Sequence, residues 1–205
     1  PWTWDEAVTN VAAGDRVNVK AGNYSTTGSS STTSGSLSQP IVFRGYKDAI
    51  GDMDGVPLHG LVDGTDIPTI DSTADNQGAK GQFIYFNNMS FTTNSSYRSQ
   101  VWSLGLYGAA THCRFISTQP QSSCPANGYT FFGCYFETAS NYTALKSARL
   151  IDNCVFRGVN GGITDPIGIS ALHGVCTNSL FVNFSLAFNF SYPSIGLASN
   201  NTFVD

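Results

Sequence analysis

Charged residues are scarce in this sequence. Asp, Glu, Lys and Arg make up 12% of the 205 residues, roughly half of their share in an ordinary soluble domain. The 10 Lys and Arg residues stand against 14 Asp and Glu residues, which gives a formal net charge of −4 at pH 7. A mildly acidic chain without a basic stripe lacks the electrostatic attraction that nucleic-acid binding requires. We therefore expect no nucleic-acid partner.

Long apolar runs are missing as well. No run approaches the roughly 18 apolar residues that span a bilayer, so we expect no membrane partner. No basic segment followed by an apolar one opens the chain at Pro1, which predicts synthesis in a cytoplasm without a signal peptide. The five Cys residues are odd in number and have no CxxC or zinc-like spacing, so we expect free, buried thiols.

A four-residue pattern that ends in Phe recurs six times from residue 88 onward. Its copies end at Phe91, Phe115, Phe136, Phe156, Phe181 and Phe203. Successive copies lie 20 to 25 residues apart, a spacing typical of proteins whose repeats stack on one another. In a parallel β-helix each repeat is one coil, and coils about 4.8 Å apart align equivalent residues as ladders. The repeat predicts an all-β solenoid with coils of about 22 residues over 82–205.

The other positions of the pattern support the same interpretation. The residue two before the Phe is Cys113, Cys134 or Cys154 in three successive copies, and Cys packs as a small hydrophobic residue. Because side chains alternate along a strand, these residues and the ladder Phe should point inward together, and their neighbours outward. A buried Cys ladder therefore explains this spacing better than a metal cluster. The first position is mostly Asn, which favours a turn between strands.

The first third of the chain predicts an N-terminal cap followed by further coils. Thr3-Trp-Asp-Glu6 has the pattern of a capping box, which predicts a short capping helix within residues 1–14. Residues 16–20, 40–44 and 67–70 alternate or are β-prone and predict strands. Residues 25–38 are almost wholly Ser, Thr and Gly, which predicts a protruding loop. Without a linker, we expect one domain over 1–205, with further coils or a second subunit beyond residue 205, which falls in mid-coil.

Three N-terminal segments carry a resemblance to a known superfamily. Residues 4–8 (WDEAV), 13–24 (AGDRVNVKAGNY) and 40–46 (PIVFRGY) resemble the capping segment of right-handed parallel β-helix proteins of the pectate-lyase-like superfamily. The resemblance implies a right-handed solenoid. It does not specify an activity, because the superfamily contains polysaccharide lyases, glycosidases and non-catalytic phage tailspike and virion proteins. The sequence is most similar to the last group.

Four residues are candidates for a lyase site. A uronate lyase needs a cation beside the substrate carboxylate and a base that removes a carbon-bound proton. Glu137 and Arg157 each follow a ladder Phe, and Arg114 and Tyr135 each precede one, so all four should lie on one outer face. An inter-coil salt bridge accounts for the same residues, and the motifs typical of pectate lyases are absent from the sequence. We therefore expect no catalytic residues, with a lyase as the alternative.

A short acidic motif raises the possibility of calcium. Asp52 and Asp54 form a D-x-D-G fragment, which is part of a calcium-binding loop but lacks its remaining ligands. The same residues beside Gly are ordinary turn formers. We expect no cofactor, with calcium at Asp52 and Asp54 as the alternative.

Apolar residues at outward positions of the later coils predict a covered surface. These residues are Val155, Leu180, Val182, Phe184 and Phe188. Outward apolar residues concentrated in one region are typical of a protein interface, so we expect a homo-oligomer. A trimer is the assembly that the resemblance implies.

Together these observations predict a structural virion protein of a bacteriophage, of the capsid-decoration, fibre or tailspike type. Such a protein acts by assembly and display on the virion surface, with other virion proteins as partners. Two alternatives stay open at this point. One is a lyase that cleaves uronate-containing polysaccharides, and the other is a carbohydrate-binding adhesin.

Overall fold

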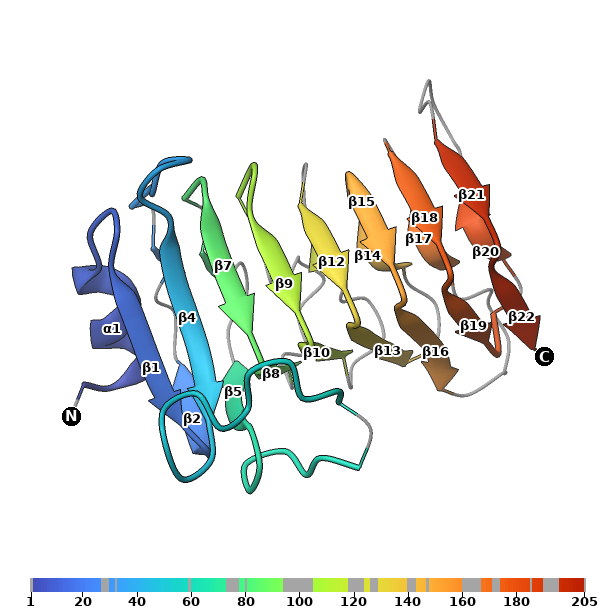
Figure 1. Ribbon diagram of the computed structural model, residues 1–205. Coiled ribbons are helices and arrows are strands. Elements are labelled where there is room, and N and C mark those ends of the chain that lie inside the picture. The colour runs from blue at the N-terminus through green and yellow to red at the C-terminus, as the bar shows by residue number, and fades with distance from the viewer. Residues whose placement is uncertain are drawn as a thin grey trace.

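The chain of the computed structural model winds into a rod of stacked coils, with the N-terminus at one end and the C-terminus at the other (Figure 1). The structure describes residues 2–26, 30–31, 33–58, 60–72, 78–79, 81–93, 105–117, 124–125, 129–139, 143–146, 148–159, 167–170, 174–184, 186–189 and 196–204. Within these residues, no helix is long and apolar enough to cross a membrane.

Two long parallel sheets of eight strands each, here named sheet A and sheet B, form the rod. Sheet A contains β1 (Arg16–Lys20), β4 (Ile41–Tyr46), β7 (Ile84–Asn87), β9 (Ala109–Thr111), β12 (Thr130–Phe132), β15 (Leu150–Asp152), β18 (Val175–Thr177) and β21 (Leu197–Ser199). Sheet B contains β2 (Gly22–Thr26), β5 (Pro68–Ser72), β8 (Ser90–Thr93), β10 (Arg114–Ser117), β13 (Tyr135–Ala139), β16 (Val155–Val159), β19 (Leu180–Val182) and β22 (Thr202–Val204).

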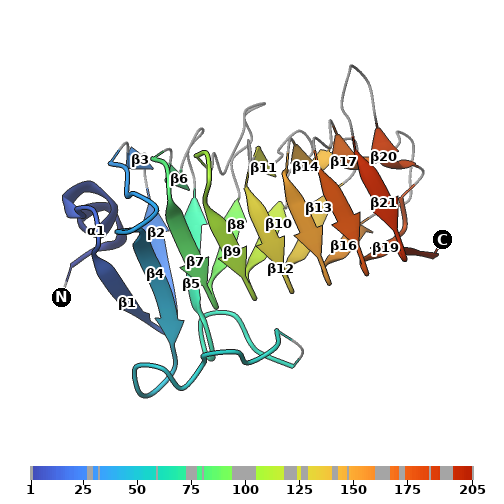
Figure 2. The same cartoon turned by 45° about the horizontal axis from the view of Figure 1, so that its top comes forward.

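Two smaller sheets complete the coils. The first contains β11 (Cys124–Pro125), β14 (Thr143–Lys146), β17 (Ile167–Ser170) and β20 (Leu186–Asn189), and the second pairs β3 (Ser30–Ser31) with β6 (Gly78–Ala79). Figure 2 shows the four-stranded sheet along the edge of the rod away from the long loop between β4 and β5. Because each strand pairs in parallel with its equivalent in the next coil, the prediction of an all-β parallel solenoid is confirmed.

The predicted Phe ladder is present in the register of sheet B. Each ladder Phe lies directly opposite the next one along the chain, from Phe91 to Phe203. Successive rings stack with centroids 4.7 to 5.4 Å apart. Rings at this distance gain stacking energy in addition to the burial of their area. The ladder therefore fixes the register of the coils as well as filling their interior.

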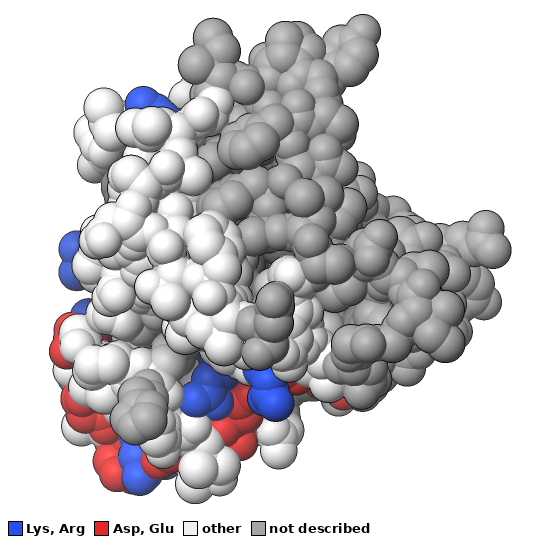
Figure 3. All heavy atoms as spheres, turned by 90° about the vertical axis from the view of Figure 1, so that its right-hand side faces the viewer, with Lys and Arg blue, Asp and Glu red and all other residues white. Residues whose placement is uncertain are grey.

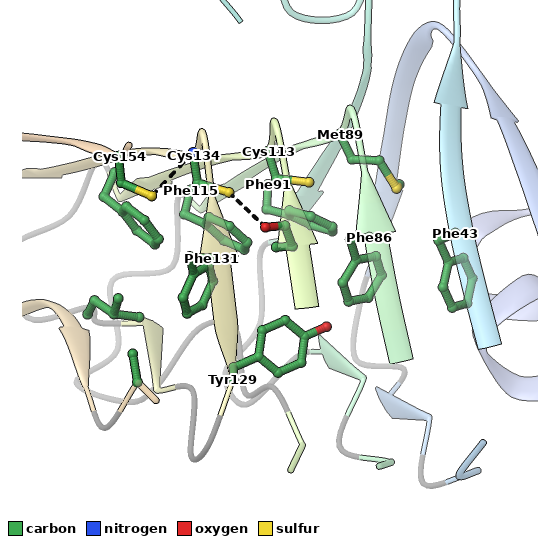
Figure 4. Packing of buried hydrophobic residues seen from close by; sticks show 14 of the residues in the cluster. Phe43, Phe86, Met89, Phe91, Cys113, Phe115, Tyr129, Phe131, Cys134 and Cys154 are labelled. Carbon is green, nitrogen blue, oxygen red and sulfur yellow. Dashed lines mark hydrogen bonds between the residues drawn. The ribbon is translucent and has the colours of Figure 1, made fainter. Parts of the chain in front are cut away.

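Sulfur-containing side chains form a second ladder beside the rings. Met89, Cys113, Cys134 and Cys154 follow one another along the rod (Figure 4), and all four are buried. Burial disfavours the thiolate, and it raises the pKa of Cys113 to about 12. These thiols are packing residues, as the spacing predicted.

The corners between sheets A and B have left-handed backbone. Residues at this position have φ between 48° and 60°: Asn88, His112, Gly133, Asn153, Asn178 and Asn200. Asn and Gly enter this region at low cost, whereas most side chains do not. The corner column thus explains why each copy of the sequence pattern begins with one of these residue types.

A short helix closes the N-terminal end of the rod. Helix α1 (Trp4–Asn10) begins at the predicted capping box, in which the Thr3 hydroxyl accepts a hydrogen bond from the backbone N–H of Glu6 and the Glu6 carboxylate accepts one from that of Thr3. Trp4 is buried, with its ring 5.3 Å from that of Phe43. The cap covers core rings that the first coil would otherwise expose to solvent.

The predicted loop over residues 25–38 is in part strand. Strand β2 continues to Thr26, and β3 (Ser30–Ser31) pairs with β6. Backbone pairing with the next coil satisfies N–H and C=O groups whatever the side chains are. A Ser- and Thr-rich composition therefore overstated the extent of this loop.

Candidate binding groove beside the strap

A long loop between β4 and β5 folds back against the coils that follow it (Figure 1). We name this loop, residues 47–58 and 60–66, the strap. Arg114 on β10 holds it in place, since its guanidinium donates to the carbonyls of Leu58 at 2.9 Å and Leu61 at 2.8 Å. The same side chain forms an ion pair of 2.5 Å with Asp63. Arg114 thus fastens three points of the strap to the outer face of sheet B.

Further polar contacts attach the strap along its length. Asn88 donates from its side chain to the Val56 carbonyl at 3.1 Å, and the Ser90 hydroxyl donates to Asp63 at 2.9 Å. Within the strap, an ion pair of 2.7 Å with Lys47 lowers the pKa of Asp66. In Figure 3 acidic and basic side chains gather together along the lower side of the molecule, where the strap lies.

The two calcium candidates on the strap have other partners. The Asp52 carboxylate accepts hydrogen bonds from the backbone N–H groups of Lys47, Asp48 and Ala49, and these bonds lower its pKa. Asp54 instead pairs with Arg44, 3.1 Å away. Among the described residues, no group of three or more His, Cys, Asp or Glu is placed to hold a metal ion. The geometry matches the turn interpretation of this motif.

A groove of about 700 Å³ lies between the strap and the outer face of sheet B. It is lined by Pro57, Leu58, Gly60, His112, Arg114, Ile116, Gly133, Cys134, Tyr135, Asn153 and Val155. Ile116 and Val155 are partly exposed and make the surface apolar there. The His112 imidazole lies at the corner, where partial burial lowers its pKa. The groove therefore combines apolar side chains with a few polar groups, as ligand and protein sites do.

Three of the four lyase candidates meet at the edge of this groove. The Tyr135 hydroxyl donates to Glu137 at 2.5 Å, and the Arg157 guanidinium lies 3.6 Å from the same carboxylate. Partial burial raises the pKa of Tyr135. The hydrogen bond between Arg157 and Tyr135 raises the pKa of Arg157. Arg114 faces the strap instead. The sequence thus placed all four residues on one face, but their contacts divide them into a triad and a strap anchor.

The triad of Tyr135, Glu137 and Arg157 offers contacts for binding, and its groups already contact one another. Abstraction of a carbon-bound proton requires a base whose pKa is tuned toward the working pH. The pKa of Tyr135 is raised, which keeps its hydroxyl protonated, and that of Arg157 is raised, which keeps its charge. The Glu137 carboxylate already accepts a hydrogen bond from the Tyr135 hydroxyl and pairs with the Arg157 guanidinium. The described triad is therefore a set of mutually satisfied polar groups.

The predicted interface residues divide between the surface and the core. Val155, Leu180 and Val182 lie on the outer face of sheet B and are partly exposed. The prediction that Phe184 lies at the surface is wrong, because only 9% of this residue is exposed and its ring packs against that of Phe181. The left-handed residue Asn183, with φ of 57°, turns the chain inward before it. The side chain of Phe188 lies outside the described residues.

Sequence reasoning missed the strap and its anchor. Asp52 and Asp54 indicated a turn, and Arg114 was assigned to an outward position, but nothing in the repeat relates the two. Their contact joins residues 51 positions apart. The position of a residue in the repeat predicts which residues of the adjacent coils lie beside it. An inserted loop can fold to either side of its corner, so the repeat does not predict its contacts.

Two solved structures resemble the path of the backbone. A PL6 family polysaccharide lyase from Pseudopedobacter saltans aligns with 98% of this chain and 60% of its own, at 10% identity and a TM-score of 0.35. A putative glycosyl hydrolase from Parabacteroides merdae ATCC 43184 aligns with 93% of this chain and 79% of its own, at 10% identity and a TM-score of 0.23. This chain therefore spans about 60% of the length of the lyase. No family model and no curated protein matches the sequence.

Proposed function

We propose that the chain is a non-catalytic structural protein of a bacteriophage virion, which acts by assembly and by display on the virion surface. In this role it is made in the host cytoplasm and works as a homo-oligomer together with other virion proteins. The observation that carries the proposal is the use of the charged side chains on sheet B. Arg114 anchors the strap and Arg157 pairs with Glu137, so each contributes to the architecture of the rod.

The interior of the rod supports the same role. Stacked rings and buried thiols fill the described coils, and burial raises the pKa of Cys113 and Cys176 to about 12, which keeps these two thiols protonated at neutral pH. Parallel coils whose strands pair with those of the next coil resist bending and local opening. Such a rod suits a protein that presents a fixed surface to its neighbours.

The proposal is tested by the mass of the native assembly together with an assay for turnover. Light scattering gives the mass, and the ultraviolet absorbance of unsaturated products reports cleavage of a panel of uronate polysaccharides. We expect a defined oligomer and no new absorbance. A monomer that generates the absorbance would overturn the structural role.

A second candidate is the binding or cleavage of a polysaccharide in the groove. The observation that favours it is the position of Tyr135, Glu137 and Arg157 beside a half-apolar groove, since aromatic and charged groups commonly contact sugars together. Arg157→Ala separates the two functions. A lyase loses its turnover in this variant while its stability is retained, whereas a purely structural pair changes the stability and has no turnover to lose.

A further inference from the structure

The outer face of sheet B carries two columns of side chains that run along the rod. The strand register sets both columns. The first begins with Ser90 and Arg114, which the strap covers, and continues with Tyr135, Val155, Leu180 and Thr202. The second contains Thr92, Ile116, Glu137, Arg157, Val182 and Val204. In the second column, two opposite charges stand at the centre and apolar residues flank them on both sides.

If a second copy faces this column in the reverse order, each central charge lies opposite a charge of the other sign. An axis drawn between β13 and β16, parallel to the strands, exchanges the coils on its two sides. It places Glu137 opposite Arg157 of a second copy, and Arg157 opposite Glu137 of that copy. One coil further out, Ile116 faces Val182 of the second copy. In an isologous interface each contact occurs twice in this way.

We propose that a second copy of this chain packs face to face on sheet B, antiparallel to the first, about this two-fold axis. The inference deepens the assembly role proposed above and rests on it. It selects the partner by charge complementarity, because the central charges of one copy meet charges of opposite sign in the other.

The central Arg157 has the reach that this contact needs. Its side chain is 54% exposed, although it pairs with Glu137 in its own chain. A guanidinium has five N–H donors, and Tyr135 and Glu137 of the same chain are its contacts on this face. The remaining donors can bind the carboxylate of the second copy, which would then lie between two guanidinium groups.

The antiparallel arrangement also fills the groove beside the strap. Arg114 in the first column lies opposite Leu180 of the second copy. The Leu180 side chain would enter the groove between Leu58 of the strap and Ile116, both of which line it. A parallel pair about the long axis of the rod would instead set Arg157 against Val155 of the other copy. Charge against an apolar side chain costs free energy without compensation, so the antiparallel pair is favoured.

The size of this face sets the concentration at which association is to be measured. Six strands about 4.8 Å apart give a face roughly 24 Å long, with its two columns about 7 Å apart. The area of this face is therefore well below the roughly 800 Å² per partner of a standard interface. Dissociation constants in the micromolar range are expected for contacts of this size. Sedimentation velocity from low to high micromolar concentration covers the range.

Two opposite charge reversals test the pairing. Glu137→Arg gives two positive charges at the centre of the face, and Arg157→Glu gives two negative ones. Each variant alone faces like charges and should dimerise at least about tenfold more weakly than the unsubstituted chain. Mixing them in equal amounts should restore dimers, because each heterodimer pairs a positive face with a negative one. Arg16→Glu, a reversal on the outer face of sheet A, serves as the control and should dimerise normally.

The outcomes separate this inference from the proposed function. Circular dichroism and thermal unfolding first establish that every variant is folded. If both reversals are monomeric and their mixture stays monomeric, the two-fold contact is refuted. If both variants retain the oligomer of the unsubstituted chain, another face carries the assembly, and the structural role survives while this interface does not. A monomeric unsubstituted chain that cleaves polysaccharide overturns the role itself.

Discussion

Phe131 and Phe132 are neighbours in β12 that lie on opposite faces of sheet A, and they offer a matched test of the solenoid core. Phe131 is fully buried, and its ring lies 5.1 Å from that of Phe136 and 5.7 Å from that of Phe115. Phe132 is 44% exposed on the outer face. The same substitution, Phe to Ala, should therefore have unequal costs at two adjacent positions.

The expected costs follow from burial. Phe131→Ala removes a whole ring from the interior and leaves a cavity, for which large-to-small substitutions cost about 3–5 kcal/mol. Two edge-to-face contacts are lost with it, and contacts of this kind add about 0.5–1.5 kcal/mol each. Phe132→Ala loses about half of the transfer free energy of one side chain, roughly 1–1.5 kcal/mol, and leaves no closed cavity.

Urea unfolding followed by circular dichroism measures the difference. We expect Phe131→Ala to lower the midpoint strongly and Phe132→Ala to lower it slightly, with similar slopes. Equal losses, or a larger loss at Phe132, would refute the assignment of inward and outward faces in β12. Because a slip of one residue exchanges the two faces of a strand, such a result would also place the whole ladder in another register.

Three further predictions concern the strap and the thiols. Replacing Arg114 with Met should lower the free energy of unfolding by about 1.5–3 kcal/mol, the range for hydrogen bonds to charged groups, and should open the strap to limited proteolysis. The lowered pKa values of Asp52 and Asp66 mean that their contribution to strap stability is complete above the unfolded value of 3.8 and is lost as the pH falls through the folded values. The protection of strap amides against hydrogen exchange, relative to the intrinsic exchange rate at each pH, should therefore fall below about pH 4, and Asp52→Asn should weaken this dependence. Because the pKa values of Cys113 and Cys176 are raised to about 12, alkylation at pH 8, followed by mass spectrometry, should leave both unmodified until the protein is denatured.

The coils were predictable because one physical requirement repeats in every turn. The rings from Phe91 to Phe203 must stack at the spacing of parallel strands, so the sequence shows them at the period of the coil. The corner residues follow from the same repetition, since a left-handed turn recurs at Asn88, Asn153 and Asn178. A pattern that is copied six times is visible without an alignment.

Phe184 shows where counting along a coil fails. Alternation from the ladder residue Phe181 would place a residue three positions later outside. The alternation is interrupted at Asn183, whose φ of 57° reverses the direction of the chain, and Phe184 then points inward. Asn at this position was itself a signal for a turn, so the error came from extending a strand rule across a corner.

The strap could not be predicted from the repeat of the coils. The candidate site depends both on the repeated coils and on the strap. Periodicity places Ile116, Glu137, Arg157 and Val182 in one column, because residues one coil apart become neighbours. The groove exists only because the strap stands beside that column, held by Arg114 through contacts that occur once in the described chain. If the antiparallel pair forms, the repeated part of the chain sets the order of charges along the interface, and the inserted loop determines how closely the second copy approaches. Charge reversal at Glu137 and release of the strap at Arg114 should therefore each weaken association, with effects that add in the free energy of association and so multiply in the dissociation constant.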